Sequence, residues 1–279
     1  MKILITGANG MLGQDLCPIL EDLDFVDEII ETDIENLDIT NEIQTKNTLK
    51  KVNPDIVIHC AAYTNVDMAE TEKDVAKKIN VKGTENIAKA CKSIDATLIF
   101  ISTDYVFDGV KKEKYLPTDT PNPLNTYGKT KLEAEKIVQK FCEKFYIIRT
   151  SWLYGHHGKN FVETMLKLAK ENQKEIKVVN DQIGCPTWTV ALSEAISDLI
   201  EETPDYGIYH ICGSGETSWY DFAKEIFKLS NINVNLVPCS TKEINRPAKR
   251  PLFSAMENNQ TCESWKKSLN SYLQLRVDD

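Results

Sequence analysis

The chain has 279 residues, of which 42% are hydrophobic and 27% are charged, a composition typical of a folded protein with room for one large domain and a smaller one. Its net charge of −9 disfavours nucleic acid as a partner, because such a protein needs a basic face, but it does not exclude a small anionic ligand. No apolar run is long enough to cross a bilayer and the first residues resemble a strand rather than a secretory signal, so we expect no membrane contact and a cytoplasmic location.

The first half of the chain alternates short apolar runs with helical patterns. Runs such as Ile56-Val57-Ile58 are typical of strands that are buried on both faces. We therefore expect an α/β fold, with a Rossmann-type doubly wound parallel sheet whose ligands bind at the carboxyl ends of the strands. The predicted strands cover residues 2–6, 28–32, 55–59, 97–102 and 146–149, and the predicted helices cover 11–23, 41–52, 67–94 and 127–144.

Beyond about residue 150 the pattern becomes mixed. Helical patterns at 160–171, 190–201, 218–229 and 262–273 are interspersed with strand-like runs at 177–179, 207–212 and 234–237. This pattern predicts a smaller α/β substrate-binding domain that is interleaved with the first. We expect a dinucleotide-binding domain over residues 1–151, rejoined by about 176–204, and a substrate-binding domain over about 152–175 and 205–279.

A glycine-rich segment with GxxGxxG spacing follows the first predicted strand and opens the first predicted helix. Glycines let the chain turn sharply and bring backbone amides and the N-terminus of the helix against a pyrophosphate. The alternative is an ordinary tight turn, but the position between strand and helix favours a dinucleotide site. The residues predicted to bind the cofactor here are Gly7, Asn9, Gly10, Met11, Leu12 and Gly13.

The ends of the second and third predicted strands supply further candidates. A carboxylate at Asp33 or Asp38, followed by Ile39, would bind a ribose hydroxyl and repel a 2′-phosphate, although either Asp could instead cap a turn. No Arg or Lys lies between Gly13 and Lys46, so NADH is favoured, with NADPH or dual use left open. The third strand ends in small residues that admit adenosine or fill a core, and the candidates there are Ala61, Ala62 and Tyr63.

Tyr127 and Lys131 match a YxxxK pattern and share one face of a predicted helix. Ketone reduction needs a proton donor, and a nearby ammonium would lower the tyrosine pKa, which is near 10 in water, by about 2–3 units. Tyr220 and Lys224 match the same pattern in a later helix. Only the first pair follows the fourth strand closely, so we expect Tyr127 at the cofactor and Tyr220 in packing.

The fourth predicted strand ends in Ser102 and Thr103. A hydroxyl at this edge can donate to a substrate carbonyl and stabilise the developing charge. Because side chains alternate along a strand, only one of the two faces the cleft, and the pattern by itself does not choose between them.

The remaining motifs predict neither a disulfide framework nor a metal site. The eight cysteines are dispersed without a CxxC pair, and the four histidines do not alternate with them at ligand spacing. Residues 128–130 resemble the tail of a P-loop, but Pro123 stands where its first glycine is required, so we reject that interpretation.

Taken together, these segments resemble the extended short-chain dehydrogenase/reductase superfamily and, within it, the dTDP-4-dehydrorhamnose reductase family. The resemblance covers nearly the whole chain. STDYVFDG and NDQIGCPT are far more specific for this family than YxxxK. The matching segments include TGANGMLG (6–13), STDYVFDG (102–109), NTYGKTKLEAE (125–135), VVNDQIGCPTW (178–188) and RPAKRP (246–251).

The resemblance implies an NAD(P)H-dependent oxidoreductase in which Thr103, Tyr127 and Lys131 are catalytic. Asp104 and Tyr105 would line the substrate pocket, Trp152 would contact the sugar, and Asn160, Arg246 and Arg250 would lie near the nucleotide. From their chemistry alone, the basic residues of 246–250 suit a diphosphate or a solvated loop equally well. The implied reaction converts dTDP-4-dehydro-L-rhamnose to dTDP-L-rhamnose for polysaccharide biosynthesis.

The chain departs from the family pattern in ways that affect its partners. Met68 and the segment 256–258 replace residues that are common in the family. Some members dimerise through a magnesium site. Asp15 could supply one ligand, but no acid lies between Pro186 and Glu194, so we predict no metal and either a monomer or a homodimer. Two alternatives remain, a reductase of another nucleotide-linked 4-keto sugar and a non-catalytic regulatory subunit, although the intact Thr/Tyr/Lys set argues against the second.

Overall fold

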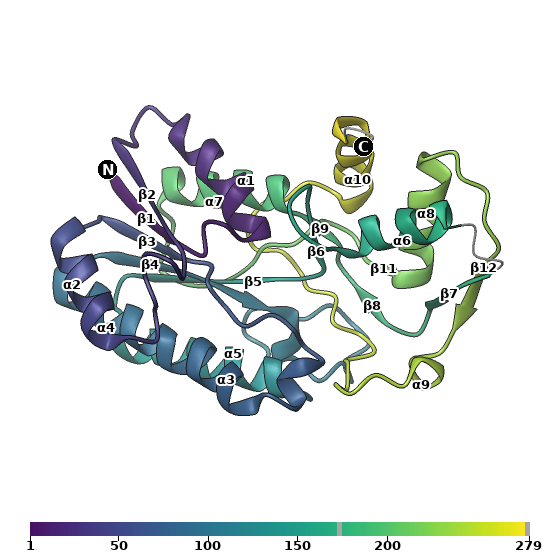
Figure 1. Cartoon of the computed structure of the whole chain (residues 1–279), viewed down its shortest axis with the longest axis horizontal. Helices are drawn as coiled ribbons and strands as arrows, with labels where there is room; N and C mark the ends of the chain where they lie inside the picture. The colour runs from purple at the N-terminus through teal and green to yellow at the C-terminus, as the bar shows by residue number, and fades with distance from the viewer. Residues whose placement is uncertain (172–174, 277–279) are drawn as a thin grey trace.

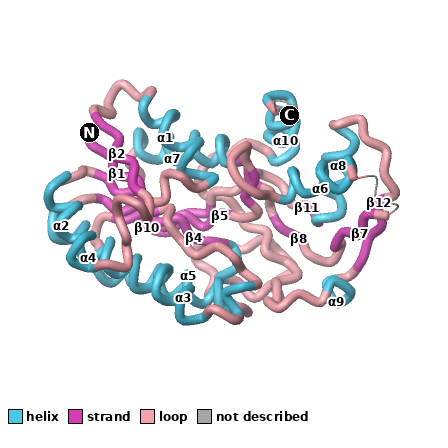
Figure 2. Tube along the Cα trace, viewed as in Figure 1, coloured by secondary structure: helices cyan, strands magenta, loops and turns pink. Residues whose placement is uncertain are grey.

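The central feature of the computed structural model, which describes residues 1–171 and 175–276, is a six-stranded parallel sheet (Figures 1 and 2). Its strand order is β10-β5-β4-β3-β1-β2. The strands are β1 (Lys2–Thr6), β2 (Glu28–Thr32), β3 (Ile56–His59), β4 (Thr97–Thr103), β5 (Phe145–Thr150) and β10 (Gly207–His210). The predicted Rossmann-type doubly wound sheet is thereby confirmed, and the order reverses between β1 and β3, where such sheets bind ligands.

Helices cover both faces of the sheet. In Figure 1, α1 (Met11–Glu21) and α7 (Thr189–Glu202) lie on one face, and α2 (Glu42–Val52), α4 (Thr84–Ile94) and α5 (Thr126–Phe141) lie on the other. Successive side chains of a strand point to opposite faces of the sheet, so each strand contributes to the hydrophobic cores on both faces. Ile3 and Ile5 of β1 join the core under α1 and α7, whereas Leu4 joins the core on the opposite face.

The helix predicted over residues 67–94 is interrupted after residue 70 and continues without a gap from residue 73 to residue 94, and its four successive elements differ in helical type. They are η1 (Met68–Glu70), α3 (Lys73–Lys77), the wide turns of η2 (Lys78–Gly83) and α4. Asn80 explains the wide turns, because its buried side-chain amide bonds to both the N–H and the carbonyl of Tyr63. These long-range bonds override the local helical pattern, and wide turns of this kind often occur at functional sites.

The second half of the chain adds short paired strands and helices at one end of the sheet (Figure 1). β7 pairs in parallel with β12, β8 pairs with β11, and β6 pairs with β9. The strands are β6 (Leu153–Tyr154), β7 (Ile176–Val179), β8 (Ile183–Gly184), β9 (Thr187–Trp188), β11 (Thr217–Ser218) and β12 (Leu236–Cys239). The helices are α6 (Phe161–Lys170), α8 (Trp219–Leu229), α9 (Thr241–Ile244) and α10 (Trp265–Leu275).

Strand β10 belongs to the central sheet, whereas the predicted domain ranges place its residues in the smaller unit. Those ranges assign residues 207–210 to the smaller unit, but β10 pairs with β5 and forms the edge of the central sheet. The reason is tertiary, because α7 packs on α1 and returns the chain beside β5. The domain boundaries themselves remain a proposal, and residues 172–174 and 277–279, which they include, lie outside the described residues.

Two global features follow from the described residues. The eight cysteine thiols are unpaired, and all except the half-buried Cys60 are buried. Within residues 1–171 and 175–276, no helix is both long and apolar enough to span a membrane.

Candidate active site

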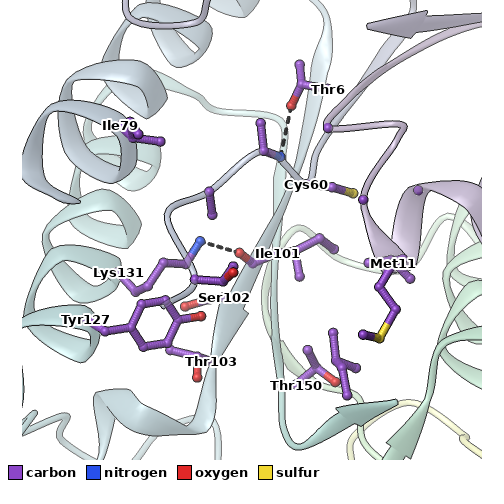
Figure 3. Close-up of a pocket in the computed structure, with 18 of the residues that line it drawn as sticks. Thr6, Met11, Cys60, Ile79, Ile101, Ser102, Thr103, Tyr127, Lys131 and Thr150 are labelled. Atoms are coloured by element: carbon purple, nitrogen blue, oxygen red, sulfur yellow. Dashed lines mark hydrogen bonds between the residues drawn. The ribbon is translucent and has the colours of Figure 1, made fainter. Parts of the chain in front are cut away.

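A cleft of about 710 Å³ lies at the carboxyl ends of the central strands. Figure 3 shows Tyr127, Lys131 and Thr103 together on one side of this pocket, with Met11 and Cys60 on the other. The strand ends therefore bring together the predicted glycine turn and the predicted catalytic residues, which are more than ninety residues apart in the sequence.

The glycine turn leaves no room for side chains. Gly7 has a φ of +71°, and a Cβ on it would lie 2.7 Å from the backbone nitrogen of Ala61, just after the end of β3. A Cβ on Gly13 would lie 2.5 Å from the carbonyl oxygen of Ala8. The close approach of these segments forms the narrow turn that a pyrophosphate needs.

The N-terminus of α1 is suited to an anion. Its N-cap, Gly10, offers no side chain to the first backbone N–H groups, and the first turn contains no acidic residue. Gly10, Met11, Leu12 and Gly13 all line the cleft. Free N–H groups at the positive end of the helix dipole are favourable partners for phosphate.

Both candidate aspartates make turn contacts and also line the cleft. Asp33 Oδ2 accepts from the backbone N–H of Asn9 at 3.0 Å, which links the end of β2 to the glycine turn. Asp38 Oδ1 accepts from the backbone N–H and the hydroxyl of Thr40 at 2.9 and 2.8 Å. Ile39, Ala61 and Ala62 line the same cavity.

Two observations test whether these residues fit a dinucleotide. The first is the glycine cradle, which a Cβ would fill. The second is Thr150, whose hydroxyl is buried at the cleft without a hydrogen-bond partner among the described atoms. Buried polar groups without partners are rare, so an unpaired hydroxyl at this position favours a polar ligand. The residues that line the cleft therefore fit a dinucleotide.

Helix α5 places Tyr127 and Lys131 one turn apart. Asn125 caps the helix by accepting from Gly128 N at 2.8 Å. Lys131 is buried, and its Nζ donates to the carbonyl of Ile101 at 2.6 Å. The same ammonium lies 4.0 Å from the ring centroid of Phe100, and burial lowers the pKa of Lys131 to about 7.

The pKa of Tyr127 differs from the sequence-based expectation. Burial raises it above the ordinary value, a hydrogen bond with Thr103 lowers it by less, and the charge of Asp104 raises it further. Lys131 directs its ammonium to Ile101 instead (Figure 3). The expected lowering is therefore absent from this state, because desolvation disfavours the phenolate.

The two hydroxyls at the end of β4 have different partners. Ser102 Oγ donates to Glu135 Oε1 at 2.5 Å, and Glu135 forms a buried ion pair with Arg149 at 2.8 Å. Thr103 Oγ1 instead donates to Asp104 Oδ1 at 3.1 Å and lies beside Tyr127. Strand alternation thus leaves Thr103 as the hydroxyl beside Tyr127.

Asp104 and Tyr105 line the cleft beside Tyr127. Asp104 is buried, and its Oδ2 accepts from the hydroxyl of Ser254 at 2.6 Å. Burial raises the pKa of Asp104 to about 7, against the lowering effect of its hydrogen bonds with Ser254 and Thr103. The ring of Tyr105 packs edge-on against Tyr127, with centroids 6.1 Å apart.

Trp152 and Trp219 form an aromatic wall at the end of the cleft. Their indole rings stack with centroids 3.5 Å apart, and both residues line the cavity. Trp152 has a φ of +48°, and its ring fits beside Gly184, where a Cβ would lie 2.4 Å from it. The predicted sugar contact is therefore held in an unusual backbone conformation by its neighbours.

A second cavity of about 780 Å³ adjoins the first, and Tyr105 and Trp219 line both. Apolar side chains of α6 and basic side chains of residues 242–250 face it, including Arg246 and Arg250. In the structure both arginines are hydrogen bonded to Asp67, with nitrogen–oxygen distances of 2.9–3.2 Å.

Several candidates lie outside the lining of both cavities. Asn160 is the buried N-cap of α6 and bonds to Glu163 N and Gly155 O. Tyr63 directs its hydroxyl to Glu72 at 2.6 Å, and Asn9 contributes through its backbone bond to Asp33. Tyr220, of the second YxxxK match, packs against the hydrophobic core.

Asp15, the one candidate metal ligand, is committed within the protein. Its buried carboxylate accepts from the hydroxyl of Thr189 and lies 3.4 Å from His157 Nε2. Across the described part of the chain, no group of three or more His, Cys, Asp or Glu residues is arranged to hold a metal ion.

Four residues at the site were not singled out by the sequence. Asn80, Asp67, Thr150 and Trp219 look locally like ordinary helix, loop, strand-end and helix-start residues. A usable signal existed for Asp67, Asn80 and Thr150, which lie in the segments 60–70, 79–91 and 149–155 that also resemble the family. The roles of Asn80 and Asp67 depend on partners between 17 and 183 residues away, which no local pattern encodes.

Comparisons with known proteins agree with this geometry. The family model of the RmlD substrate binding domain matches residues 1–276. A crystal structure of a dTDP-4-dehydrorhamnose reductase from Clostridium acetobutylicum superposes with a TM-score of 0.95 at 47% identity, covering 99% of each chain. The Bacillus anthracis dTDP-4-dehydrorhamnose reductase in complex with NADP gives 0.93 at 43%, covering 98% of each. The spore coat polysaccharide biosynthesis protein SpsK of Bacillus subtilis is 39% identical, over 99% of this chain and 98% of its own.

Proposed function

The chain belongs to the RmlD substrate-binding-domain family, in the extended short-chain dehydrogenase/reductase superfamily of NAD(P)H-dependent oxidoreductases, and we propose that it reduces dTDP-4-dehydro-L-rhamnose to dTDP-L-rhamnose. The meeting of Tyr127, Lys131 and Thr103 opposite the glycine turn carries this proposal. The adjoining cavity with its basic side chains supplies room for a nucleotide diphosphate beside the reacting sugar.

The glycine turn and the ends of β2 and β3 would hold a nicotinamide cofactor, which would supply the hydride for the C4 carbonyl carbon. Tyr127 gives its phenolic proton to the ketone oxygen, so that the C=O bond becomes C–OH. Thr103 donates a hydrogen bond to the same oxygen as negative charge develops on it. Lys131 holds positive charge near the phenolate that remains, and its pKa of about 7 lets it exchange a proton at neutral pH.

The substrate extends across both cavities in this proposal. Asp104 and Tyr105 contact the sugar, and Trp152 packs against its ring. The diphosphate lies toward residues 246–250, and the nucleoside occupies the second cavity. Asn160 acts indirectly, by capping α6, whose residues Phe161 and Met165 line that cavity.

The glycine turn and the ends of β2 and β3 would hold the cofactor. Asp33 favours NADH, because its carboxylate would repel a 2′-phosphate. The Bacillus anthracis relative was solved with NADP, so both cofactors need to be compared. The test is kcat/KM with NADH and with NADPH for the native protein and Asp33→Asn. Removal of the charge is expected to raise the NADPH/NADH ratio about tenfold, and an unchanged ratio would contradict the role of Asp33.

The reaction is tested by giving purified protein dTDP-4-dehydro-L-rhamnose, following cofactor oxidation and determining the configuration of the product at C4. A panel of other dTDP- and GDP-linked 4-keto sugars separates the proposed substrate from the first alternative. A clear preference for another sugar would contradict the proposed substrate but would still agree with the proposed reduction of a C4 ketone. Absence of turnover on the whole panel, with co-purification of a larger enzyme, would favour a regulatory subunit. We propose a monomer or homodimer that needs no metal, which sedimentation with and without a chelator tests.

A further inference from the structure

Asp67, in the segment that follows β3, binds the loop 246–250 through several hydrogen bonds. Its carboxylate accepts from Arg246 Nη1 at 3.2 Å, from Ala248 N at 3.2 Å and from Arg250 Nη1 and Nη2 at 2.9 Å each. These partners lie about 180 residues away along the chain. One carboxylate therefore competes with any substrate diphosphate for both arginines.

The two arginines are held to different degrees. Arg250 forms a two-point pair with Asp67 and is 12% exposed, whereas Arg246 makes one contact and is 56% exposed. Arg250 Nη1 also donates to the carbonyl of Ala248 at 3.1 Å. Two-point pairs in partly buried positions are stronger than single exposed contacts, so Arg246 is the arginine that an incoming anion can recruit.

Arg250 is also connected to the catalytic helix. Its positive charge acts on the phenol of Tyr105 and opposes the rise that burial causes in the pKa of that phenol, and the ring of Tyr105 packs against Tyr127. The carbonyl of Lys249 accepts from Asn125 Nδ2 at 2.9 Å, and Asn125 caps helix α5. The loop is thus attached to the first turn of α5 through both its backbone and Arg250.

We propose that Asp67 and Arg250 form a clasp that positions Tyr105 and the first turn of α5, while Arg246 alone binds the diphosphate of the substrate. The assignment rests on the proposed function. It makes Arg250 a positioning residue and Arg246 a binding residue, although both lie in one loop. Arg246 exchanges Asp67 for the ligand, and the two-point pair stays intact.

The test compares dTDP affinity with turnover in four variants. Arg246→Ala is expected to weaken dTDP binding about tenfold in calorimetry, with kcat at saturating substrate changed by less than about twofold. Asp67→Asn and Arg250→Ala are expected to weaken dTDP binding by no more than about threefold but to lower kcat about tenfold. Arg250→Lys is expected to behave like Arg250→Ala, because an ammonium cannot form the two-point pair. Lys224→Ala, a loss of one positive charge on exposed α8, serves as the charge control.

A double-mutant cycle and a measurement without ligand complete the test. The double variant Asp67→Asn/Arg250→Ala is expected to lose no more kcat than either single variant, as required of two partners in one contact. Hydrogen exchange of the ligand-free protein is expected to quicken at residues 126–131 in Asp67→Asn but not in Arg246→Ala. If Arg250→Ala does not fold, dTDP affinity and kcat are compared in Arg250→Lys and Asp67→Asn instead.

Two results would overturn the clasp. One is loss of dTDP affinity in Arg250→Lys as large as in Arg246→Ala, with kcat unchanged. The other is unchanged hydrogen exchange at the start of α5 in Asp67→Asn. Failure of the proposed function has a different signature, because the native protein would then neither bind dTDP nor turn over the sugar nucleotide, while the exchange experiment would still report on the clasp.

Discussion

The indole ring of Trp219 lies face to face with that of Trp152, with 3.5 Å between centroids and 5° between planes. Trp152 adopts a left-handed backbone conformation with a φ of +48°, which costs a residue other than glycine about 1–3 kcal/mol. The stack and the open space at Gly184 compensate for that cost. The placement of the proposed sugar contact is thus a property of the tertiary structure.

Removal of Trp219 is expected to release Trp152. In Trp219→Ala we expect KM for the sugar nucleotide to rise about tenfold with a smaller change in kcat, because the sugar contact is no longer pre-positioned. The near-UV circular dichroism of the coupled indole pair should disappear in the same variant. Trp265→Phe removes an indole that does not stack on another tryptophan ring and is the control. A dichroism spectrum that is equally affected by both variants would contradict the coupling of Trp152 to Trp219.

The two YxxxK matches give a matched pair of variants for the proton donor. Tyr127→Phe is expected to lower kcat about 10²–10⁴-fold, the usual contribution of a positioned acid, while cofactor affinity is retained. Tyr220→Phe is expected to leave turnover near the native value, because this side chain packs against the core. Steady-state kinetics and cofactor titration check both, and full activity of Tyr127→Phe would exclude the mechanism.

Removal of the Ser102 hydroxyl and removal of the Thr103 hydroxyl are expected to have different effects. Thr103→Val should lower kcat about 10²-fold, because it removes the hydroxyl that the proposed mechanism uses to donate to the developing oxyanion. Ser102→Ala should retain kcat but lower the free energy of unfolding by about 1–3 kcal/mol, since buried Glu135 loses a donor. Kinetics and urea unfolding of both variants separate the roles. The reverse pattern would assign the catalytic hydroxyl to Ser102.

Asp104 is expected to make stability depend on pH. Its pKa is raised to about 7 in the folded protein, from 3.8 as the ordinary value, chiefly by burial. Between these values the folded state holds a proton that the unfolded state releases, so the contribution is complete below about pH 4 and is lost as pH rises to about 7. Urea unfolding across this range should show a flatter curve for Asp104→Asn than for the native protein. Asp198→Asn, on the exposed face of α7, is the control, and equal slopes for all three proteins would contradict the assignment.

Much of the fold was predictable because its determinants are local. The apolar strands, the turn at Gly7 and the caps at Asn41 and Asn125 are set by periodicity and by contacts within a few residues. The wide turns at residues 78–83, inside the helix predicted over 67–94, were not predictable, because Asn80 bonds to Tyr63 across the fold.

The proposed catalytic residues could be predicted from the sequence only as candidates. Local spacing placed Tyr127 and Lys131 on one helical face, but it matched Tyr220 equally well, and it left Ser102 and Thr103 unresolved. The structure distinguishes them by position, because Tyr127 lines the cleft and Ser102 Oγ donates to buried Glu135.

The sequence by itself determined the apolar strands, the glycine turn and the helix that carries the tyrosine and lysine, since each depends on patterns of residues that are close along the chain. Only the tertiary structure decided that Arg250 pairs with Asp67, that Trp219 supports Trp152 and that Gly207–His210 completes the sheet. Each of these depends on contacts between segments far apart in the sequence, where burial and charge pairing outweigh local preference.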